Sequence, residues 1–591
     1  MSAAQAVAER FTMVTDLLAL WARRKPLQTA FTHLNFDASP PLTVSYAELA
    51  RSSAQIAAGL SPYRLRGRPV LLLYPAGPDF APAFFGALLA GAIATPVPVP
   101  RFESQYHRLD SVAADCTPGA LLSTASTLDW LGPRLGAESP LRKCPWLASD
   151  KLASDKEEAS LSLLSEPPKP ADIAVLQYTS GSTSDPRGVA VTHANLAHNL
   201  ATITSEFQPS VNARLLSWLP HFHDMGLIGG VLSPLTWGGE SILMSPQQFL
   251  RRPLRWLEAI SEYGVEVSGA PNFAYELCVN RANRGGPDAL GAALDLSSWR
   301  IAFVGAEPIR AATLTGFTES FKTFGFQRSG LLPCYGLAEA TLLVTCKPAR
   351  TVPTIYPVSR EGLEQGRATL SGQRDALQLV GCGYPVAGTD VRIVDPASGE
   401  SLGHNRVGEL WVAGPQVARG YWNDRDNPSF CAKLPGCPGQ AFLRTGDLGF
   451  LTEDGEFVFV ERLKDLIVLN GQNYVCHDLD QTVSASHPLL RADGCAVGLI
   501  ETDQGPQMLV IAEFPAQDLG RAEETANAIR GALFTVYGLS ARTVAFIPIG
   551  KLSRTTSGKL QRRATLKRLA SGSLRLLAHS GEPIPGFSHL I

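Results

Sequence analysis

The residues best suited to bind a polyanion lie in one short segment, Tyr178 to Val189, which is rich in glycine and small hydroxyl side chains. It follows an apolar run, Ala174-Val175-Leu176, that predicts a buried strand. A loop of this composition brings backbone N–H groups and hydroxyls close to phosphate oxygens. It is not a Walker A loop, because Pro186-Arg187 stands where that loop has Gly-Lys. We predict a phosphate-binding loop, with an ordinary polar surface loop as the alternative. Its candidate ligands are Thr179, Ser180, Gly181, Ser182 and Thr183.

Three later segments carry side chains suited to the rest of a nucleotide. Val304 to Pro308 follows a predicted strand, and α/β folds bind ligands at the carboxyl ends of parallel strands. In Tyr335 to Thr341, an aromatic ring beside glycine can stack on a base. The carboxylate of Glu339 in that segment can hold Mg2+ against phosphates. Asp447 follows Thr445-Gly446, and a carboxylate there can accept hydrogen bonds from ribose hydroxyls.

Two further segments are suited to an organic acid. Trp218 to Gly226 contains His221 and His223, although a lone histidine in a sequence is most often structural. We favour His223 as the functional residue of the two. Gly269 to Cys278 has an apolar face that suits either a pocket wall or a core helix.

Together with Glu461 to Asp465 and Leu552 to Leu560, these segments resemble the adenylate-forming superfamily in order and spacing over nearly the whole chain. Its members activate carboxylic acids as acyl-AMP. The resemblance implies ATP as a substrate, Mg2+ as a cofactor and pyrophosphate as a product. It assigns catalytic roles to Lys559 and His223, metal binding to Glu339, the interdomain hinge to Lys464, and ATP binding beyond the phosphate loop to Gly305, Ala306, Glu307, Pro308, Tyr335, Gly336, Leu337, Ala338, Asp447 and Arg462.

The chain departs from the superfamily pattern at three positions within these segments. Ala338 replaces a threonine that many relatives carry, which puts a hydroxyl contact there in doubt. Arg187 replaces the commonest lysine and still suits phosphate. Glu461 stands where Gly-Arg usually begins the hinge motif.

Within the superfamily, the chain most resembles fatty acyl-AMP ligases, through residues 218–226, residues 271–275 and an extra segment at about 351–378. In that family the insertion packs against the C-terminal domain and disfavours the arrangement that admits coenzyme A. The acyl group then passes to the phosphopantetheine thiol of an acyl carrier protein. Alternatives are an ordinary surface loop in an acyl-CoA ligase, or an enzyme that activates aryl or amino acids. The resemblance places the acyl pocket at Met225, Gly226, Asn272 and Phe273.

A basic helix is predicted after Lys559. Arg562, Arg563, Lys567, Arg568 and Arg575 could dock an acidic carrier protein, or could equally form a solvated face without a partner.

The elements that must position these residues alternate between short β-branched runs and helical patterns, which indicates α/β layers with largely parallel sheets. The resemblance implies a large N-terminal domain with two α/β subdomains and a small β-barrel-like subdomain, and a small mobile α+β C-terminal domain. We predict the boundary between residues 463 and 464, giving domains 1–463 and 464–591. Phe80 to Pro100 is long and uncharged, but its glycines and prolines favour a buried helix and strand over a membrane span.

Bulk composition narrows the class of protein further. The 52 basic and 54 acidic residues nearly cancel, so no global field favours nucleic acid. The ten cysteines contain no CxxC pair, which disfavours a zinc site or a secreted disulfide framework. With no signal-peptide pattern at the N-terminus, we expect a cytoplasmic enzyme.

Overall fold

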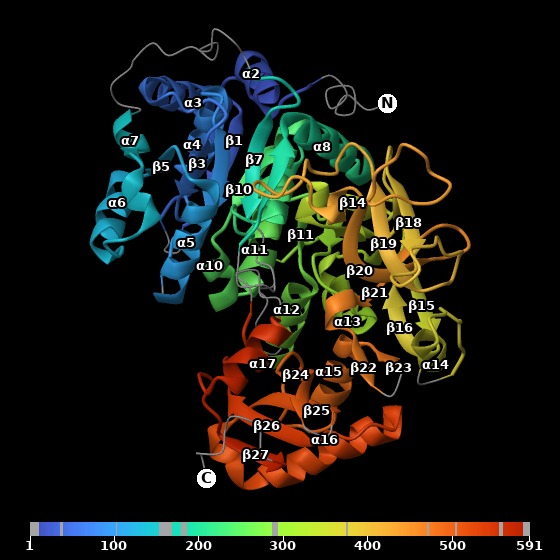
Figure 1. Ribbon diagram of the computed structural model, residues 1–591. Coiled ribbons are helices and arrows are strands. Elements are labelled where there is room, and N and C mark those ends of the chain that lie inside the picture. Colours follow the sequence, from blue (N-terminus) through green and yellow to red (C-terminus); the bar gives the residue numbers. More distant parts are fainter. Residues whose placement is uncertain are drawn as a thin grey trace.

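The computed structural model describes residues 11–35, 39–101, 103–152, 168–178, 186–285, 294–373, 376–469, 472–502, 505–554 and 560–582. A large N-terminal domain carries the layered sheets, and a smaller C-terminal domain packs below it in the view of Figure 1. The predicted α/β class is therefore confirmed.

The largest sheet has nine strands in the order β17-β14-β13-β12-β11-β9-β10-β1-β2. Its central strands run parallel, and antiparallel strands close both edges. The parallel strands are buried, as expected for strands covered on both faces. The strands are β1 (Thr29–His33), β2 (Leu42–Ser45), β9 (Arg214–Ser217), β10 (Glu240–Leu243), β11 (Val267–Ala270), β12 (Ile301–Val304), β13 (Leu331–Gly336), β14 (Leu343–Cys346) and β17 (Tyr384–Pro385).

A second sheet has six strands in the order β6-β5-β3-β4-β7-β8. The last pair, β7 and β8, is antiparallel, and the candidate phosphate loop connects these two strands. The strands are β3 (Pro69–Leu73), β4 (Ile93–Val97), β5 (Ala120–Ser123), β6 (Trp146–Ala148), β7 (Ile173–Tyr178) and β8 (Gly188–Thr192).

One apolar core joins the two sheets through the helices between them. Some of these helices start at capping boxes: in α8, the hydroxyl of Thr192 accepts from the N–H of Asn195 at 3.1 Å, and the N–H of Thr192 donates to Asn195 Oδ1 at 3.0 Å. The helices are α2 (Val14–Arg24), α3 (Tyr46–Leu60), α4 (Phe80–Leu89), α5 (Glu103–Cys116), α6 (Ala125–Leu131), α7 (Ser149–Leu152), α8 (His193–Phe207), the π-helix η4 (Met225–Leu232), α9 (Ser233–Thr236), α10 (Pro246–Arg251), α11 (Leu254–Tyr263), α12 (Asn272–Gly285) and α13 (Ala311–Phe321).

The uncharged stretch from Phe80 forms α4 followed by β4, both buried, as predicted. Across the described ranges, no helix has the length and apolar character that crossing a membrane requires.

A small antiparallel sheet, β18-β19-β20-β21, completes the N-terminal domain (Figure 1). Gly455 closes the β20–β21 hairpin with φ at +86°, a conformation that favours glycine. The segment predicted as an insertion forms the hairpin β15–β16 with a short helix, α14, between its strands. The elements are β15 (Ile355–Val358), α14 (Arg360–Glu364), β16 (Leu377–Val380), β18 (Asp390–Val394), β19 (Gly408–Ala413), β20 (Leu443–Leu451) and β21 (Phe457–Arg462).

The C-terminal domain is built on a four-stranded sheet in the order β24-β25-β26-β27, with its own apolar core. Its strands and helices form the small α+β domain that the resemblance implied. The elements are β22 (Ile467–Leu469), β23 (Gln472–Tyr474), α15 (Cys476–Ala485), β24 (Cys495–Thr502), β25 (Gly505–Phe514), α16 (Ala522–Tyr537), β26 (Thr543–Pro548), α17 (Arg562–Ala570) and β27 (Ala578–Gly581).

Candidate active site

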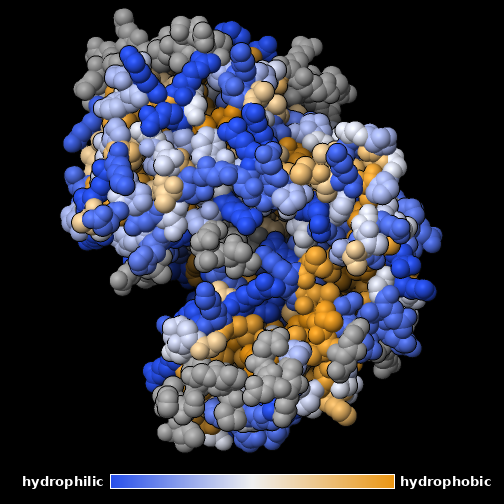
Figure 2. All heavy atoms as spheres, in the orientation of Figure 1, coloured by the Kyte–Doolittle hydropathy of each residue, from blue (hydrophilic) through white to orange (hydrophobic). Residues whose placement is uncertain are grey.

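A cleft of about 990 Å³ lies at the junction of the two domains. Figure 2 shows the surface hollowed there, with hydrophobic residues gathered along the junction. The N-terminal domain lines the cleft with the loops that follow β12 and β13 and with residues of β20 and β21, and the C-terminal domain with α15 and the start of α17. Apart from Gly226, every predicted site residue that the structure describes borders this cleft.

One side of the cleft holds a buried carboxylate between two donors. The hydroxyl of Tyr335 donates to Asp447 Oδ2 at 2.7 Å, and Arg462 Nε lies 3.1 Å from Asp447 Oδ1. Asp447 and Arg462 stand opposite each other in the β20–β21 register, so the sheet itself sets this geometry. The charge of Asp447 raises the pKa of the Arg462 guanidinium, so the arginine stays charged. Such a carboxylate, fixed and buried, can accept hydrogen bonds from vicinal hydroxyls.

Gly336 lets the chain turn sharply after the Tyr335 ring. A Cβ on Gly336 would lie 1.8 Å from the carbonyl oxygen of Leu342, so only glycine fits this position. Leu337 and Ala338 follow and also line the cleft. The methyl of Ala338 offers no hydroxyl contact.

Glu339 lies four residues beyond Tyr335, in a single 3-10 turn that follows β13. The hydroxyl of Tyr421 donates to Glu339 Oε1 at 3.0 Å, and the guanidinium of Arg187 lies over the Tyr421 ring, 5.2 Å from its centroid. Burial raises the pKa of Glu339, while the Tyr421 hydrogen bond opposes that rise. Arg187, at the end of the candidate phosphate loop, is therefore linked through Tyr421 to Glu339, the candidate metal ligand.

No group of three or more His, Cys, Asp or Glu side chains among the described residues could by itself hold a metal ion. A single carboxylate nevertheless fits Mg2+, which commonly binds through one or two carboxylates and completes its shell with substrate phosphates and water. Glu339 is suited to that role.

The loop Gly305–Pro308 follows β12 and borders the cleft. Ala306 has φ at +67°, an unfavourable conformation for a residue with a side chain, of the kind that concentrates at ligand sites. Glu307 Oε1 accepts from the backbone N–H of Phe273 at 2.6 Å, so this carboxylate caps the start of α12. The loop is thus held in shape by the helix that forms the next wall of the cleft.

His223 and His221, which the sequence could not separate with certainty, have different surroundings. His223 borders the cleft, and its Nδ1 lies 2.6 Å from Asp224 Oδ1. His221 stacks on Phe80 at a centroid distance of 4.0 Å, and burial lowers its pKa to about 3. His221 is not among the lining residues, which agrees with its predicted structural role.

The four predicted acyl-pocket residues differ in their roles: some line the cleft with apolar side chains, and others hold neighbouring segments together. Met225 and Phe273 line the cleft with apolar side chains. Asn272 also borders it, but its Oδ1 accepts from the backbone N–H of Arg310 at 3.0 Å and so joins α12 to α13. A Cβ on Gly226 would lie 2.0 Å from the carbonyl oxygen of Pro220, so this glycine serves close packing.

The sequence analysis missed an apolar part of the cleft lining, which we call the apolar limb. Its walls come from α8, η4, β12 and the loop before β14, four elements far apart in the sequence. Its residues have the composition of ordinary core, so no local signal marked them. The apolar limb is formed by Ile203, Phe207, Gly229, Phe303 and Leu342.

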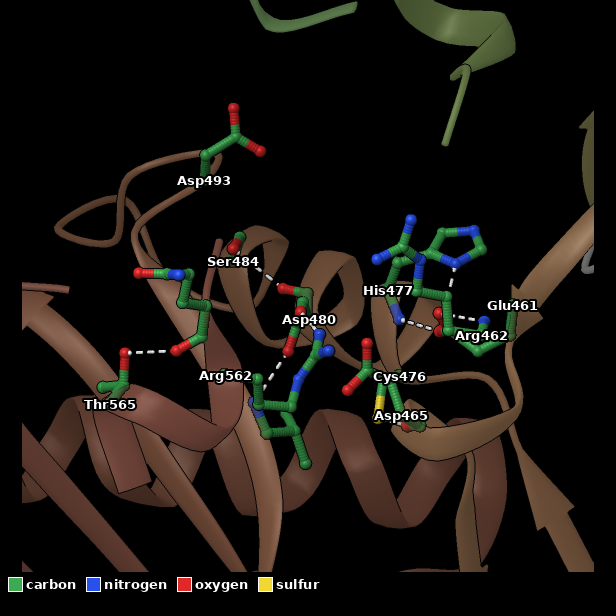
Figure 3. Close-up of polar contacts among 12 residues, drawn as sticks. Glu461, Arg462, Asp465, Cys476, His477, Asp480, Ser484, Asp493, Arg562 and Thr565 are labelled. Carbon is green, nitrogen blue, oxygen red and sulfur yellow. Dashed lines mark hydrogen bonds and ion pairs between the residues drawn. The ribbon is translucent and has the colours of Figure 1, made fainter. Parts of the chain in front are cut away.

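At the hinge, Glu461 joins the end of β21 to the start of α15 (Figure 3). Its Oε2 accepts from the backbone N–H of His477 at 3.2 Å and lies 3.5 Å from His477 Nδ1. Although burial opposes ionisation, the side chain of His477 and the charge of Arg562 hold the pKa of Glu461 at about 2. The carboxylate is therefore ionised, and it links the two domains beside the cleft.

The predicted hinge residue, Lys464, also borders the cleft, and burial lowers its pKa. Its carbonyl oxygen accepts from Arg563 of α17. Cys476, at the start of α15, contacts the carbonyl oxygen of Asp465 rather than a reactive partner, so Cys476-His477 is not a nucleophile pair.

Lys559 and Thr179 to Thr183 lie outside the described residues, so their predicted roles stay predictions. Arg554 and Leu560, which flank the segment containing Lys559, both line the cleft.

Three cysteines also border the cleft: Cys334, Cys382 and Cys495. Burial raises the pKa of each of these thiols to about 12. They therefore stay protonated at neutral pH.

Comparison with known proteins places this geometry in a family. The sequence profile of AMP-binding enzymes matches residues 18–422, and that of the AMP domain of Disco-interacting protein 2-like proteins matches residues 464–579. The medium-chain-fatty-acid–[acyl-carrier-protein] ligase JamA of Moorena producens is 36% identical over 577 residues, which cover 95% of this chain and 96% of the relative.

Solved structures agree with the sequence matches. A fatty acyl-adenylate ligase from Legionella pneumophila, in complex with acyl adenylate and pyrophosphate, is 34% identical with a TM-score of 0.73, covering 97% of this chain and 98% of that one. A structure from a study of fatty acyl-adenylate ligases of E. coli and L. pneumophila is 30% identical with a TM-score of 0.84, covering 95% and 98%. The chain belongs to the AMP-binding enzyme family, and its predicted resemblance to fatty acyl-AMP ligases is confirmed.

Proposed function

We propose that this protein activates a fatty acid with ATP, forms the acyl-adenylate and releases pyrophosphate, and then transfers the acyl group to the phosphopantetheine thiol of an acyl carrier protein. The observation that carries the proposal is one cleft that combines the Tyr335–Asp447–Arg462 cluster with the apolar limb. The polar part suits a nucleotide, and the apolar part suits a hydrocarbon chain.

The nucleotide would bind along the polar side of the cleft. Asp447 is placed to accept hydrogen bonds from ribose hydroxyls, the Gly305–Pro308 loop would hold the base, and Tyr335 would stack beside it. The phosphates would extend toward Glu339 and Arg187, where the candidate phosphate loop ends.

The attack of a carboxylate on the α-phosphate brings two negatively charged groups together, so positive charge is needed at that point. Mg2+ held by Glu339 would supply part of it as a Lewis acid. Lys559 would supply another part, since Arg554 and Leu560 bring both ends of its segment to the cleft. His223, whose ring is held by Asp224, would face the carboxylate of the fatty acid.

An ion pair supports a carrier protein rather than coenzyme A as the acceptor. Arg360 of α14, in the predicted insertion, pairs with Asp478 of α15 through two hydrogen bonds of 2.8 and 3.0 Å. The Asp478 side chain is only 6% exposed, so this pair couples the insertion to the C-terminal domain firmly. Such a contact would restrain rotation of that domain.

From the sequence, the basic residues in and after α17 could all dock an acidic carrier protein. In the structure, three of them already bind groups of this protein. Arg562 pairs with Asp480, Arg563 binds the carbonyl oxygen of Lys464, and Arg568 donates to Ser553 Oγ at 3.0 Å. These three side chains serve the domain itself. Lys567 and Arg575 are the exposed basic residues left for an acidic partner.

We place the enzyme in the cytoplasm, because its ten cysteines are all free thiols, as suits a reducing compartment.

The test is ATP–pyrophosphate exchange with a panel of fatty acids, followed by acyl transfer to coenzyme A and, separately, to a holo acyl carrier protein. We expect exchange that depends on a fatty acid and a product on the carrier protein. Efficient formation of acyl-CoA would instead identify an acyl-CoA ligase. Exchange with amino acids or aryl acids but not with fatty acids would contradict the proposed substrate.

A further inference from the structure

One glycine in the lining of the apolar limb, Gly229, has room for a larger side chain. Of three glycines in the π-helix η4, Gly226 and Gly230 are closed in: a Cβ would lie 2.0 Å from the Pro220 carbonyl oxygen and 2.7 Å from Ser217 Oγ, respectively. A Cβ on Gly229 would meet only the Leu342 side chain, at an ordinary contact distance of 3.7 Å. Gly229 is also the glycine of the three that lines the cleft.

The helix that carries Gly229 also connects it to the reacting end of the cleft. η4 begins at Met225, directly after His223 and Asp224. Gly229, within this helix, follows His223 by six residues. π-Helical turns occur frequently at functional sites.

A pair of aromatic rings also lines the apolar limb. Phe207, at the end of α8, stacks on Phe303 of β12 at a centroid distance of 5.6 Å and an angle of 30°. The two residues are 5% and 4% exposed, and they belong both to the main apolar core and to the lining of the cleft. Both rings are part of a close-packed core and cannot move aside without opening a void.

We propose that Gly229 and the Phe207–Phe303 pair determine the length of the acyl chain that the enzyme accepts. This inference rests on the proposed function, because it assigns the apolar limb to the hydrocarbon tail of the activated fatty acid. Gly229 leaves the limb wide enough for the chain, and the stacked rings end it.

The inference predicts opposite effects at Gly229 and at Phe207. A side chain at Gly229 would occupy space that the terminal part of the chain needs, and long substrates would be excluded. Removal of the Phe207 ring would extend the limb, and longer substrates would gain contacts. One methylene in a hydrophobic pocket changes kcat/KM by roughly tenfold or more, so both effects are measurable.

The experiment measures kcat/KM in the exchange assay for saturated fatty acids that differ by two carbons. The readout is the ratio of kcat/KM for a chain four carbons longer than the wild-type optimum to that for the optimum. Gly229→Leu should lower this ratio about tenfold or more, and Phe207→Ala should raise it by a similar factor. Phe207→Leu, which removes less volume, should raise it less and guards against a poorly folded Phe207→Ala protein.

Two control variants separate chain length from general damage. Gly316→Leu adds the same side chain on α13, where a Cβ meets no atom within 4 Å. Phe317→Leu removes a ring that is fully buried but does not line the cleft. Both controls should keep the wild-type ratio, because a loss of folded enzyme lowers both rates equally.

The outcomes distinguish this inference from the proposed function. A wild-type enzyme that is active with fatty acids, combined with ratios unchanged within threefold in all Gly229 and Phe207 variants, would overturn the chain-length inference alone. A wild-type enzyme without exchange on any fatty acid would overturn the proposed function and the inference with it.

Discussion

Asp447 is the carboxylate on which the polar contacts of the candidate nucleotide site converge. Its two oxygens are held separately, one by the hydroxyl of Tyr335 and the other by the guanidinium of Arg462. A buried carboxylate with two donors keeps its orientation before any ligand arrives, which reduces the entropic cost of binding.

Asp447→Asn should weaken the use of ATP. The amide keeps the size of the carboxylate but loses its charge and presents an N–H₂ group to one of the two donors. Hydrogen bonds to charged groups contribute roughly 1.5–3 kcal/mol, so kcat/KM for ATP should fall by about one to two orders of magnitude. ATP titrations in the exchange assay measure the effect.

Asp454→Asn is a matched control, since Asp454 accepts from Tyr384 in an exposed turn outside the cleft. An Asp447→Asn enzyme with the ATP dependence of the control would remove Asp447 from the nucleotide site.

Tyr421→Phe should shift the pH dependence of activity. Burial raises the pKa of Glu339 and the Tyr421 hydroxyl lowers it, so loss of the hydroxyl raises this pKa further. A carboxylate with a raised pKa is protonated at higher pH and then no longer attracts Mg2+. The acid limb of the kcat/KM profile for Mg·ATP should therefore move to higher pH.

Tyr384→Phe removes a hydroxyl that donates to the exposed Asp454 and should leave this profile in place. Superimposable profiles for Tyr421→Phe and wild type would show that Glu339 is not the group that titrates.

Residue type and spacing were sufficient to select Tyr335, Glu339 and Asp447, because each lies in a short segment whose side chains suit one part of a nucleotide or its metal ion. Tyr421 and Phe207 could not be selected. Tyr421 acts by donating a hydrogen bond to Glu339, which lies 82 positions away in the sequence. Phe207 looks like an ordinary core aromatic in the sequence, and only the fold shows that it lines the cleft.

At the scale of elements, α14 matters more than its five residues suggest. It presents Arg360 to α15, and the guanidinium also lies over the Tyr537 ring at 5.7 Å from its centroid. The charge of Asp478 and the hydrogen bonds to it raise the pKa of Arg360 although burial opposes this, so the pair stays ionised. The hairpin β15–β16 carries α14 and thereby connects the small domain to the large one.

Arg360→Met should change the choice of acceptor. It keeps an unbranched side chain but leaves the buried Asp478 without its partner, at a cost on the order of 2 kcal/mol, or roughly thirtyfold in an equilibrium. If this pair restrains the C-terminal domain, acyl-CoA should form faster relative to acyl carrier protein. Product analysis with both acceptors measures that ratio.

Arg392→Met breaks the exposed Arg392–Asp390 pair within β18 and serves as the control. A product ratio equal to that of the control would mean that α14 is a surface element without influence on the acceptor.

The apolar runs predicted a buried strand at Ala174-Val175-Leu176, which lies within β7, and a buried helix and strand between Phe80 and Pro100, where α4 and β4 lie. Neither the order of strands within the sheets nor the meeting of α8 with η4 could be predicted, because both depend on contacts between distant segments.

At the scale of the whole molecule, the two domains meet through buried charges rather than through apolar surface alone. Glu461 binds His477 on one side of the hinge, and Arg310 of the large domain pairs with both Glu276 and Asp493. Such contacts specify one relative orientation, because a displaced charge would be left without a partner.

Glu461→Gln should loosen that orientation. The amide can accept from only one of the donors that face the carboxylate, and it lacks the charge that attracts His477 and Arg562. Small-angle X-ray scattering should then show a broader distribution of interatomic distances than for wild type. In parallel, kcat for exchange should fall severalfold.

Glu523→Gln, at an exposed position of α16, is the control and should scatter like the wild type. A Glu461→Gln protein with unchanged scattering and exchange would show that this carboxylate does not hold the domains.

The three thiols that border the cleft affect the fate of an activated acyl group. Acyl transfer to sulfur needs a thiolate, and burial keeps the pKa of Cys334, Cys382 and Cys495 at about 12. An acyl-adenylate formed beside them would therefore not acylate the enzyme itself. In the proposed transfer, the acceptor thiol would meet no competing thiolate from these three cysteines, so they would not divert the reactive anhydride.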